Sequence, residues 1–154
     1  MKITEFLDKK GIKIGIESIE KEDILKEMVD VLANVKDIGD KKGIVKALID
    51  RENLGSTGIG QGIAIPHGKT DRVDELVAVL GISQKGVNFE ALDGEPVYIL
   101  FLLVAPKETA GPHLKALAQI SRLLRDVYFC ELLRRCKTPD EVYELIRKEE
   151  EKKH

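Results

Sequence analysis

A glycine-rich stretch between positions 51 and 70 leads to the residue with the clearest chemical potential, His67. Glycines stand at 55, 58, 60 and 62, and Ile63-Ala64-Ile65-Pro66 then precedes His67. A neutral imidazole is nucleophilic, and histidine is largely neutral at pH 7. Glycines allow backbone N–H groups to crowd around an anion. This combination predicts a phosphohistidine at His67. The alternative is a solvent-facing histidine beside an ordinary glycine-rich turn.

Side chains beside the glycines add groups that bind anions. Arg51 has a permanent charge on a planar fork that matches phosphate geometry, and hydroxyl donors follow at positions 56 and 57. Arg51 near a helix end would also interact favourably with the helix dipole, with no other role. We predict that Arg51 and His67 act together in catalysis. The predicted phosphate-binding residues are Ser56, Thr57, Gly58 and Gly60.

Spacing excludes two nucleotide-binding motifs. Gly68-Lys69-Thr70 looks like the end of a P-loop, but that motif needs glycine at position 63, where isoleucine stands. The dinucleotide-binding motif G-x-G-x-x-G would need glycine at 63 or 65, and isoleucine occupies both positions. Neither motif is present.

The element that presents His67 is predicted to be short. Ile63-Ala64-Ile65 is typical of a strand, and Pro66 ends it because proline has no backbone N–H to donate. His67 is therefore expected at a strand end, in a loop that Gly68 keeps open. Loops of this kind present functional groups rather than bury them.

The other elements follow from hydrophobic periodicity. Apolar spacing predicts a helix over about 20–35, and a second helix that starts after its N-cap, Asp40, and carries Arg51 in its last turn. Residues 77–82 predict a strand. The unbroken apolar run 97–104 predicts a central strand covered on both faces.

A second histidine opens a later helix. Pro112 is predicted at the first helical position, which puts His113 on the first turn. There the helix dipole disfavours an imidazolium and favours an anion. His113 is expected to lie off the apolar stripe, and by itself such a histidine is usually a surface residue. The predicted stripe is Leu114, Leu117, Ile120 and Leu124.

Composition and the C-terminal third indicate one domain. The 154 residues show one composition throughout, and strands mixed with helices predict a single α/β domain. Asp126 and Thr138 are expected to cap two further helices. The charged run from about residue 149 is expected to be a fraying tail, and His154 receives no role.

Charge and hydropathy exclude several classes of function. The net charge of −2 gives no reason to bind nucleic acid or an anionic membrane. The longest apolar run, 97–105, is too short to cross a bilayer, and the N-terminus does not have the pattern of a signal peptide. Cys130 and Cys136 do not have a metal or redox spacing, so they are predicted to be reduced thiols of a cytoplasmic protein.

The segments Arg51-Glu52, Ser56 to Gly60 and Gly62 to Gly68 together resemble the active-site signature of enzyme IIA of the bacterial sugar phosphotransferase system. The resemblance is to the fructose/mannitol type, which includes a nitrogen-related regulatory branch, and it extends to about Ile146. It implies one such domain over 1–154, with a mixed β-sheet and helices on both faces. It also implies that His113 is a second active-site histidine.

The resemblance implies a phosphate relay without a cofactor. His67 would accept a phosphoryl group from the phosphocarrier protein HPr and pass it to a cysteine of an enzyme IIB domain. This would support uptake of fructose, mannitol or a related sugar, in the cytoplasm and in association with a IIC permease complex. One alternative is a regulator that works by phosphorylation-dependent binding. A more remote one is a metal-binding domain that uses His67 and His113, although no H-x-x-x-H spacing is present.

Overall fold

A computed structural model describes residues 1–108 and 110–152, and within them twelve elements follow one another. The prediction that assigned no role to His154 lies outside the described residues. The elements are the 3₁₀-helix η1 (Ile3–Glu5), β1 (Leu7–Ile14), α1 (Lys21–Ala33), α2 (Lys41–Glu52), β2 (Gly58–Gly60), β3 (Ile63–Ala64), β4 (His67–Lys69), β5 (Val77–Val87), β6 (Val97–Ala105), α3 (Ala110–Leu123), α4 (Val127–Arg135) and α5 (Pro139–Glu151).

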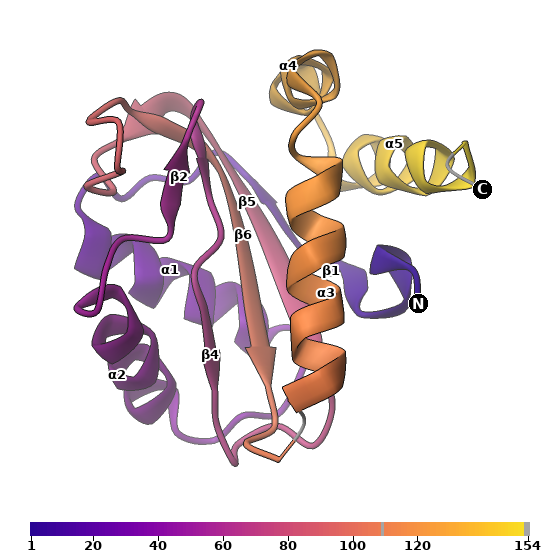
Figure 1. The fold of residues 1–154 in the computed structure, drawn as a ribbon. Helices are drawn as coiled ribbons and strands as arrows, with labels where there is room; N and C mark the ends of the chain where they lie inside the picture. The colour runs from indigo at the N-terminus through magenta and orange to yellow at the C-terminus, as the bar shows by residue number, and fades with distance from the viewer. Residues whose placement is uncertain (109, 153–154) are drawn as a thin grey trace.

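The strands form one mixed six-stranded sheet with helices on both faces, as predicted (Figure 1). The strand order is β1-β5-β6-β3-β2, and β4 also pairs with β6. Strands β5 and β6 are antiparallel, whereas β1 runs parallel to β5 and both β3 and β4 run parallel to β6. Helices α1 and α2 cover one face, and α3, α4 and α5 pack on the other.

The predicted central strand is confirmed as β6. Its side chains alternate between two cores, because successive residues of a strand point to opposite faces. Ile99, Phe101 and Leu103 join the core beneath α3, α4 and α5. Leu100 and Leu102 join the core beneath α1 and α2. An apolar run without alternation is thus explained by burial on both sides.

Strand β5 is longer than the predicted 77–82. It continues to Val87, and its pairing with β6 shifts register between Ile82 and Val87. Gly86 has φ of +85° in this irregular part. The hydrophobic run stops at Ile82, so periodicity alone does not detect the extension.

The predicted stripe of α3 is confirmed at Leu117, Ile120 and Leu124, which belong to the core or pack against it, but not at Leu114. Leu114 is 65% exposed, whereas His113 is only 6% exposed and packs on the sheet side. The helix also begins at Ala110, so Pro112 is its third residue rather than its first. Proline is tolerated there because first-turn N–H groups have no partner within the helix. The buried residues of the helix are His113, Ala116, Ile120 and Leu123.

Helix ends agree with the predicted caps, but the expected tail does not. Asp40, Asp126 and Thr138 each accept a hydrogen bond from the backbone N–H three residues later. Helix α5 continues to Glu151 instead of fraying from 149. Glu150 accepts hydrogen bonds from the N–H groups of Ile3, at 2.7 Å, and Thr4, at 3.3 Å, so this part of the tail holds the N-terminus. Within the described residues, no helix combines the length and apolar character needed to cross a membrane.

Candidate active site

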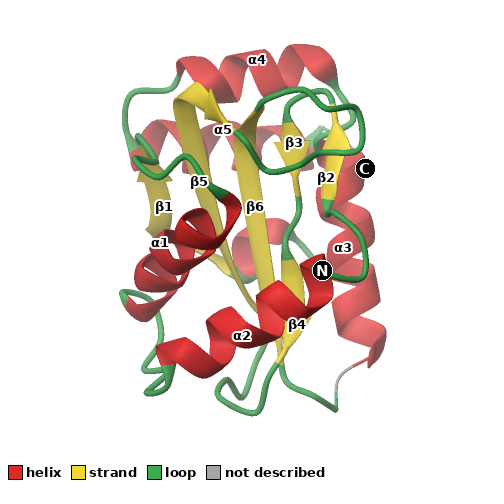
Figure 2. Cartoon of the chain, turned by 90° about the vertical axis from the view of Figure 1, so that its left-hand side faces the viewer, coloured by secondary structure: helices red, strands yellow, loops and turns green. Residues whose placement is uncertain are grey.

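Three residues predicted from sequence meet at the surface where α2, β4 and α3 approach one another. Arg51 lies in the last turn of α2, which packs on β4, the strand that His67 begins (Figure 2). The Arg51 Nε–H donates to His67 Nε2 at 3.3 Å. The ring centroids of His67 and His113 are 5.7 Å apart, with the planes inclined by 52°. Tertiary structure thus assembles a compact group from three separate segments.

His67 occupies a strand rather than the expected loop. Strand β3 contains only Ile63–Ala64, and pairing with β6 resumes at β4, where His67 lies opposite Leu103. Pro66 interrupts the ladder, yet its carbonyl accepts the N–H of Leu103 at 2.9 Å. The backbone that carries His67 is therefore held by the central strand of the sheet.

The two ring nitrogens of His67 have different partners. Nδ1 lies 2.8 Å from the carbonyl oxygen of Ile65, which can only accept a hydrogen bond. Nδ1 therefore carries the proton, and Nε2 presents a lone pair. The Arg51 N–H points to that lone pair, which agrees with this tautomer. A neutral ring with a directed Nε2 lone pair is a nucleophile ready for attack.

Arg51 is itself oriented by the glycine-containing segment. Its Nη1 donates to the carbonyl of Gly55 at 2.9 Å while Nε faces His67. The guanidinium is thus fixed at two points. Its remaining N–H groups can address an anion that arrives at His67, because a guanidinium carries five donors in one plane.

Burial and positive neighbours keep both histidines neutral. Desolvation is the main cause that lowers the pKa of His67, and the charge of Arg51 lowers it further. The hydrogen bond to Ile65 and the charge of Glu52 act in the opposite direction. Burial is also the main cause that lowers the pKa of His113, and Coulombic interactions with His67 and Lys69 lower it further.

The protonation of His113 follows from its surroundings. Its Nδ1 is buried and has no hydrogen-bond partner. A buried N–H without an acceptor is costly, which favours the tautomer of the neutral ring with the proton on Nε2. One histidine of the pair therefore offers a lone pair at Nε2, and the other offers a proton.

The segment 55–60 is already hydrogen-bonded within the protein. The N–H of Gly58 donates to Ser56 Oγ at 3.0 Å, and that hydroxyl donates to the carbonyl of Phe89 at 3.3 Å. The N–H and hydroxyl of Thr57 both donate to the carboxylate of Glu52. Phosphate binding by Ser56, Thr57, Gly58 and Gly60 stays a prediction, and Thr57 and Gly58 would have to exchange these bonds for it.

The glycines of this segment serve close packing and turn geometry. A Cβ at position 58 would lie 2.8 Å from the Cα of Ala91, so only glycine allows this approach. Gly60 has φ of +99°, a conformation that favours glycine. Packing and geometry account for these two glycines without reference to an anion.

Sequence reasoning assigned no role to Glu52, which the structure places beside the site. Glu52 is 6% exposed and is the only aspartate or glutamate among the buried residues of the described chain. A signal was present: Ile44, Leu48 and Glu52 recur every four residues, so the glutamate falls on the buried face of α2.

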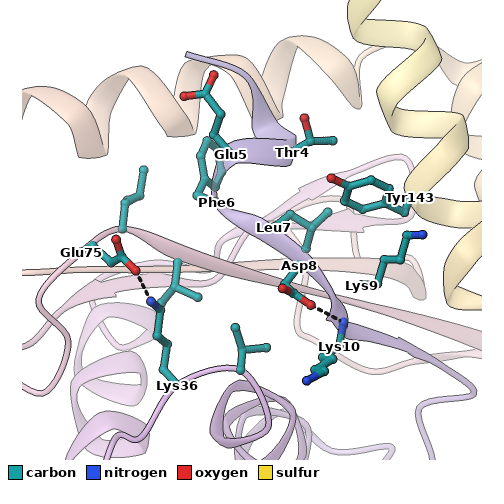
Figure 3. A pocket seen from close by; sticks show the side chains of 13 residues that line it. Thr4, Glu5, Phe6, Leu7, Asp8, Lys9, Lys10, Lys36, Glu75 and Tyr143 are labelled. Atoms are coloured by element: carbon teal, nitrogen blue, oxygen red, sulfur yellow. Dashed lines mark hydrogen bonds and ion pairs between the residues drawn. The ribbon is translucent and has the colours of Figure 1, made fainter.

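A large cleft lies elsewhere on the molecule. It has a volume of about 700 Å³ and is lined by residues of η1, β1 and β5 and by Tyr143 of α5 (Figure 3). Beside it, Lys36 forms an ion pair with Glu75, and the carboxylate of Asp8 accepts the backbone N–H of Lys10 at 2.8 Å. Arg51, His67 and His113 do not line this cleft. No group of three or more His, Cys, Asp or Glu side chains that could hold a metal is found in residues 1–108 and 110–152.

Comparison with known proteins identifies both sugar-specific components and nitrogen regulatory proteins as relatives. The family described as "Phosphoenolpyruvate-dependent sugar phosphotransferase system, EIIA 2" matches residues 5–149. The fructose-specific EIIABC component of Bacillus subtilis is 40% identical over 95% of this chain, which spans only 23% of that relative. A nitrogen regulatory protein of Bradyrhizobium diazoefficiens is 33% identical, over 95% of both chains.

Similar solved structures also include a nitrogen regulatory protein and a sugar-specific component. The nitrogen regulatory protein IIA-Ntr of Neisseria meningitidis has a TM-score of 0.86 and 30% identity, covering 94% of this chain and 98% of its own. The enzyme IIA of mannitol from Escherichia coli, solved in complex with phosphorylated enzyme IIB, has a TM-score of 0.76 and 25% identity. That match covers 90% of this chain and 95% of the other.

Proposed function

The chain belongs to the phosphoenolpyruvate-dependent sugar phosphotransferase system EIIA 2 family, and on this premise we propose that His67 carries the phosphoryl group. The observation that supports this most directly is the state of the His67 ring. Nδ1–H is bound to the Ile65 carbonyl, so Nε2 is the unprotonated, nucleophilic nitrogen. A lowered pKa keeps that lone pair available at neutral pH.

In the proposed transfer, Nε2 of His67 attacks the phosphorus of phospho-HPr in line. The new nitrogen–phosphorus bond forms as the bond to HPr breaks, and its electron pair leaves with HPr. The ring keeps its Nδ1 proton, and the Ile65 carbonyl stabilises the positive charge that develops on the imidazole. Positioning and charge stabilisation account for most catalysis of this kind.

Arg51 and His113 are proposed to hold the transferred group. Arg51 Nε now covers the Nε2 lone pair, so its N–H groups would move to the phosphoryl oxygens as the donor arrives. His113 Nε2–H would donate to another oxygen. A single arginine suits a carrier, because uniformly tight binding of phosphate would slow release to the next acceptor.

The test is labelling by purified phospho-HPr, followed by mapping of the acid-labile phosphate. We expect the label on His67 and none in His67→Ala, because the nucleophile is gone. His113→Ala should still accept phosphate but pass it on more slowly, because it loses only a donor. Label that persists in His67→Ala would refute the assignment.

We further propose that the carrier acts as a nitrogen-type regulator, with its phosphorylation state controlling binding to a partner. A relative that matches over 95% of its own length and the structure with a TM-score of 0.86 are both nitrogen regulatory proteins, whereas a fructose-specific EIIA component matches over 68% of its own length. Exposed apolar side chains next to the site offer a contact surface, with Leu54 85%, Ile59 52% and Leu114 65% exposed. The partner would meet this surface in a modest, transient interface.

Delivery to a IIB domain of fructose or mannitol type is the second candidate, favoured by the 40% identity to a fructose-specific component. The two candidates differ in where the phosphoryl group goes. Rapid transfer from phospho-His67 to the cysteine of one purified IIB domain would establish delivery. Absence of transfer to a panel of IIB domains, with binding to a kinase or other regulator that changes on phosphorylation, would establish regulation.

A further inference from the structure

A buried carboxylate lies next to the proposed site and has no part in the transfer described above. Glu52 ends α2 and directly follows Arg51. Burial of a charge is unfavourable unless the charge is paired and hydrogen-bonded. A solvent-exposed residue would suffice to end a helix, so the position of Glu52 needs a separate explanation.

Three groups from two other segments satisfy this carboxylate. Lys21 Nζ, from the first residue of α1, lies 3.0 Å from Oε1. The N–H of Thr57 donates to the same oxygen at 3.1 Å, and the Thr57 hydroxyl donates to Oε2. Lys21 also lies over the ring of Phe89, with Nζ 4.8 Å from the centroid. Glu52 thus joins the start of α1, the end of α2 and the segment before β2.

The contacts continue from Glu52 to both nitrogens of His67. Thr57, held by Glu52, accepts the N–H of Ile65 at its carbonyl, at 3.0 Å. The carbonyl of Ile65 accepts His67 Nδ1–H at 2.8 Å. On the other side, Arg51 is the residue before Glu52, and its Nε–H faces His67 Nε2. The carboxylate therefore sits at the origin of two contact paths, one to each ring nitrogen.

We propose that Glu52 is a positioning residue that fixes the ring orientation and tautomer of His67 through Thr57 and Ile65, and the place of Arg51 through the end of α2. The proposal rests on the proposed role of His67 as the phosphoryl carrier. Thr57 then acts through Glu52 and not on the phosphoryl group. Because Lys21 neutralises the carboxylate, Arg51 remains the uncompensated charge for the incoming phosphoryl group.

Another glutamate provides a matched control. Glu27 of α1 also accepts two backbone N–H groups, from Glu17 at 3.1 Å and Ser18 at 2.9 Å. It also pairs with a lysine, Lys13, at 2.8 Å, and its side chain is 11% exposed. The two carboxylates thus have similar chemistry, but the contacts of Glu27 do not lead to His67.

The test compares Glu52→Gln with Glu27→Gln in the full chain. In Glu52→Gln we expect kcat for phosphoryl transfer from phospho-HPr to fall by about 10- to 100-fold, as for other residues that orient a functional histidine. KM should change little, because the substitution of a buried residue leaves the exposed surface that meets HPr unchanged. Long-range ¹H–¹⁵N spectra should show His67 change from one tautomer to a mixture. In Glu27→Gln the kcat, KM and tautomer should equal those of the wild type.

Two outcomes would overturn the proposal. One is a Glu52→Gln protein with the kcat and the single His67 tautomer of the wild type. The other is an equal fall of kcat in both variants, which would indicate a general effect of lost stability. Should Glu52→Gln not fold, Thr57→Val removes only the hydroxyl bond to the carboxylate, and a wild-type rate and tautomer in that variant would equally overturn it.

The spectra also separate this proposal from the proposed function. If wild-type His67 does not accept phosphate, the carrier function is refuted. The tautomer comparison between the two glutamine variants still decides whether Glu52 positions the ring, because it needs no phosphoryl transfer.

Discussion

At the scale of single residues, the reactivity proposed for His67 arises because its two ring nitrogens have different partners. Ile65 holds the proton on Nδ1, and Arg51 points at the Nε2 lone pair. Arg51 has two effects on this ring. Its charge lowers the pKa of His67, and its planar donors match the oxygens of a phosphoryl group.

Substitutions of Arg51 separate these two effects. Arg51→Gln removes the charge, so the pKa of His67 should rise, whereas Arg51→Lys keeps the charge and should leave the pKa closer to that of the wild type. The measurement is an NMR titration of the His67 ring protons between pH 4 and 8. Equal His67 pKa values in the wild type and Arg51→Gln would show that the charge of Arg51 does not act on this ring.

The donor geometry of Arg51 is tested by the rate of transfer. Arg51→Lys should slow phosphoryl transfer by about 10²–10³-fold, the usual effect of losing a preorganised donor. Folding should be little affected, because Arg51 is only half-buried and lies at a helix end. Stopped-flow transfer from phospho-HPr, alongside thermal unfolding, gives both quantities. A lysine variant that transfers at the wild-type rate would rule out a role for the planar fork.

At the scale of elements, α3 shows how a helix can present a polar residue on its buried face. His113, Ala116, Ile120 and Leu123 recur at spacings of three and four and face the sheet. Hydropathy alone predicts that Leu114 rather than His113 faces the core, because leucine is more apolar than histidine. The rotation of the helix that buries His113 leaves Leu114 exposed, next to the site.

This rotation predicts opposite consequences for two apolar substitutions in α3. Ile120→Ala should lower the free energy of unfolding by about 2–5 kcal/mol, because it leaves a cavity in a fully buried position. Leu114→Ala should change it by no more than about 0.5 kcal/mol, as for other surface positions. Urea unfolding followed by circular dichroism measures both. A loss for Leu114→Ala as large as that for Ile120→Ala would contradict this orientation of α3.

At the scale of the whole molecule, the sheet carries the site between two cores. Helix α2 brings Arg51 from one layer, α3 brings His113 from the other, and β4 holds His67 between them (Figure 1). Both histidines are partly or largely withdrawn from water. Stability of the fold is therefore linked to their protonation.

The linkage predicts a loss of stability in mild acid. The pKa of each histidine is lowered in the folded state. Below about pH 6.5, the ordinary pKa of histidine, the unfolded chain therefore binds protons more readily than the folded protein. Stability present above pH 6.5 should therefore be lost as pH falls towards the lowered folded-state values. Urea midpoints between pH 5 and 8 measure this loss, and it should be smaller in His113→Gln.

The variant Glu27→Gln provides the control for the range from pH 5 to 8. The pKa of Glu27 is lowered to about 2, so its carboxylate stays ionised throughout the range from pH 5 to 8. Glu27→Gln should therefore keep the wild-type dependence of stability on pH between 5 and 8. A slope that disappears in Glu27→Gln but persists in His113→Gln would refute the role of the histidines.

Sequence by itself determined the features that depend on local patterns. The central strand β6, helices α1 and α2, and the caps Asp40 and Asp126 follow from runs, periods and cap residues within a few positions. The signature around His67 also lies in one continuous stretch, so the family was predictable from it, and His67 could be proposed as the nucleophile.

Tertiary structure alone decided what surrounds that nucleophile. His67 belongs to a strand because it pairs with Leu103, 36 positions away in the chain, and such pairing leaves no local pattern. The contact with His113 and the burial of Glu52 beside Lys21 likewise join residues that are far apart in sequence. These contacts form only when the helices pack on the sheet, because the free energy that buries a histidine or a glutamate comes from the apolar residues around it.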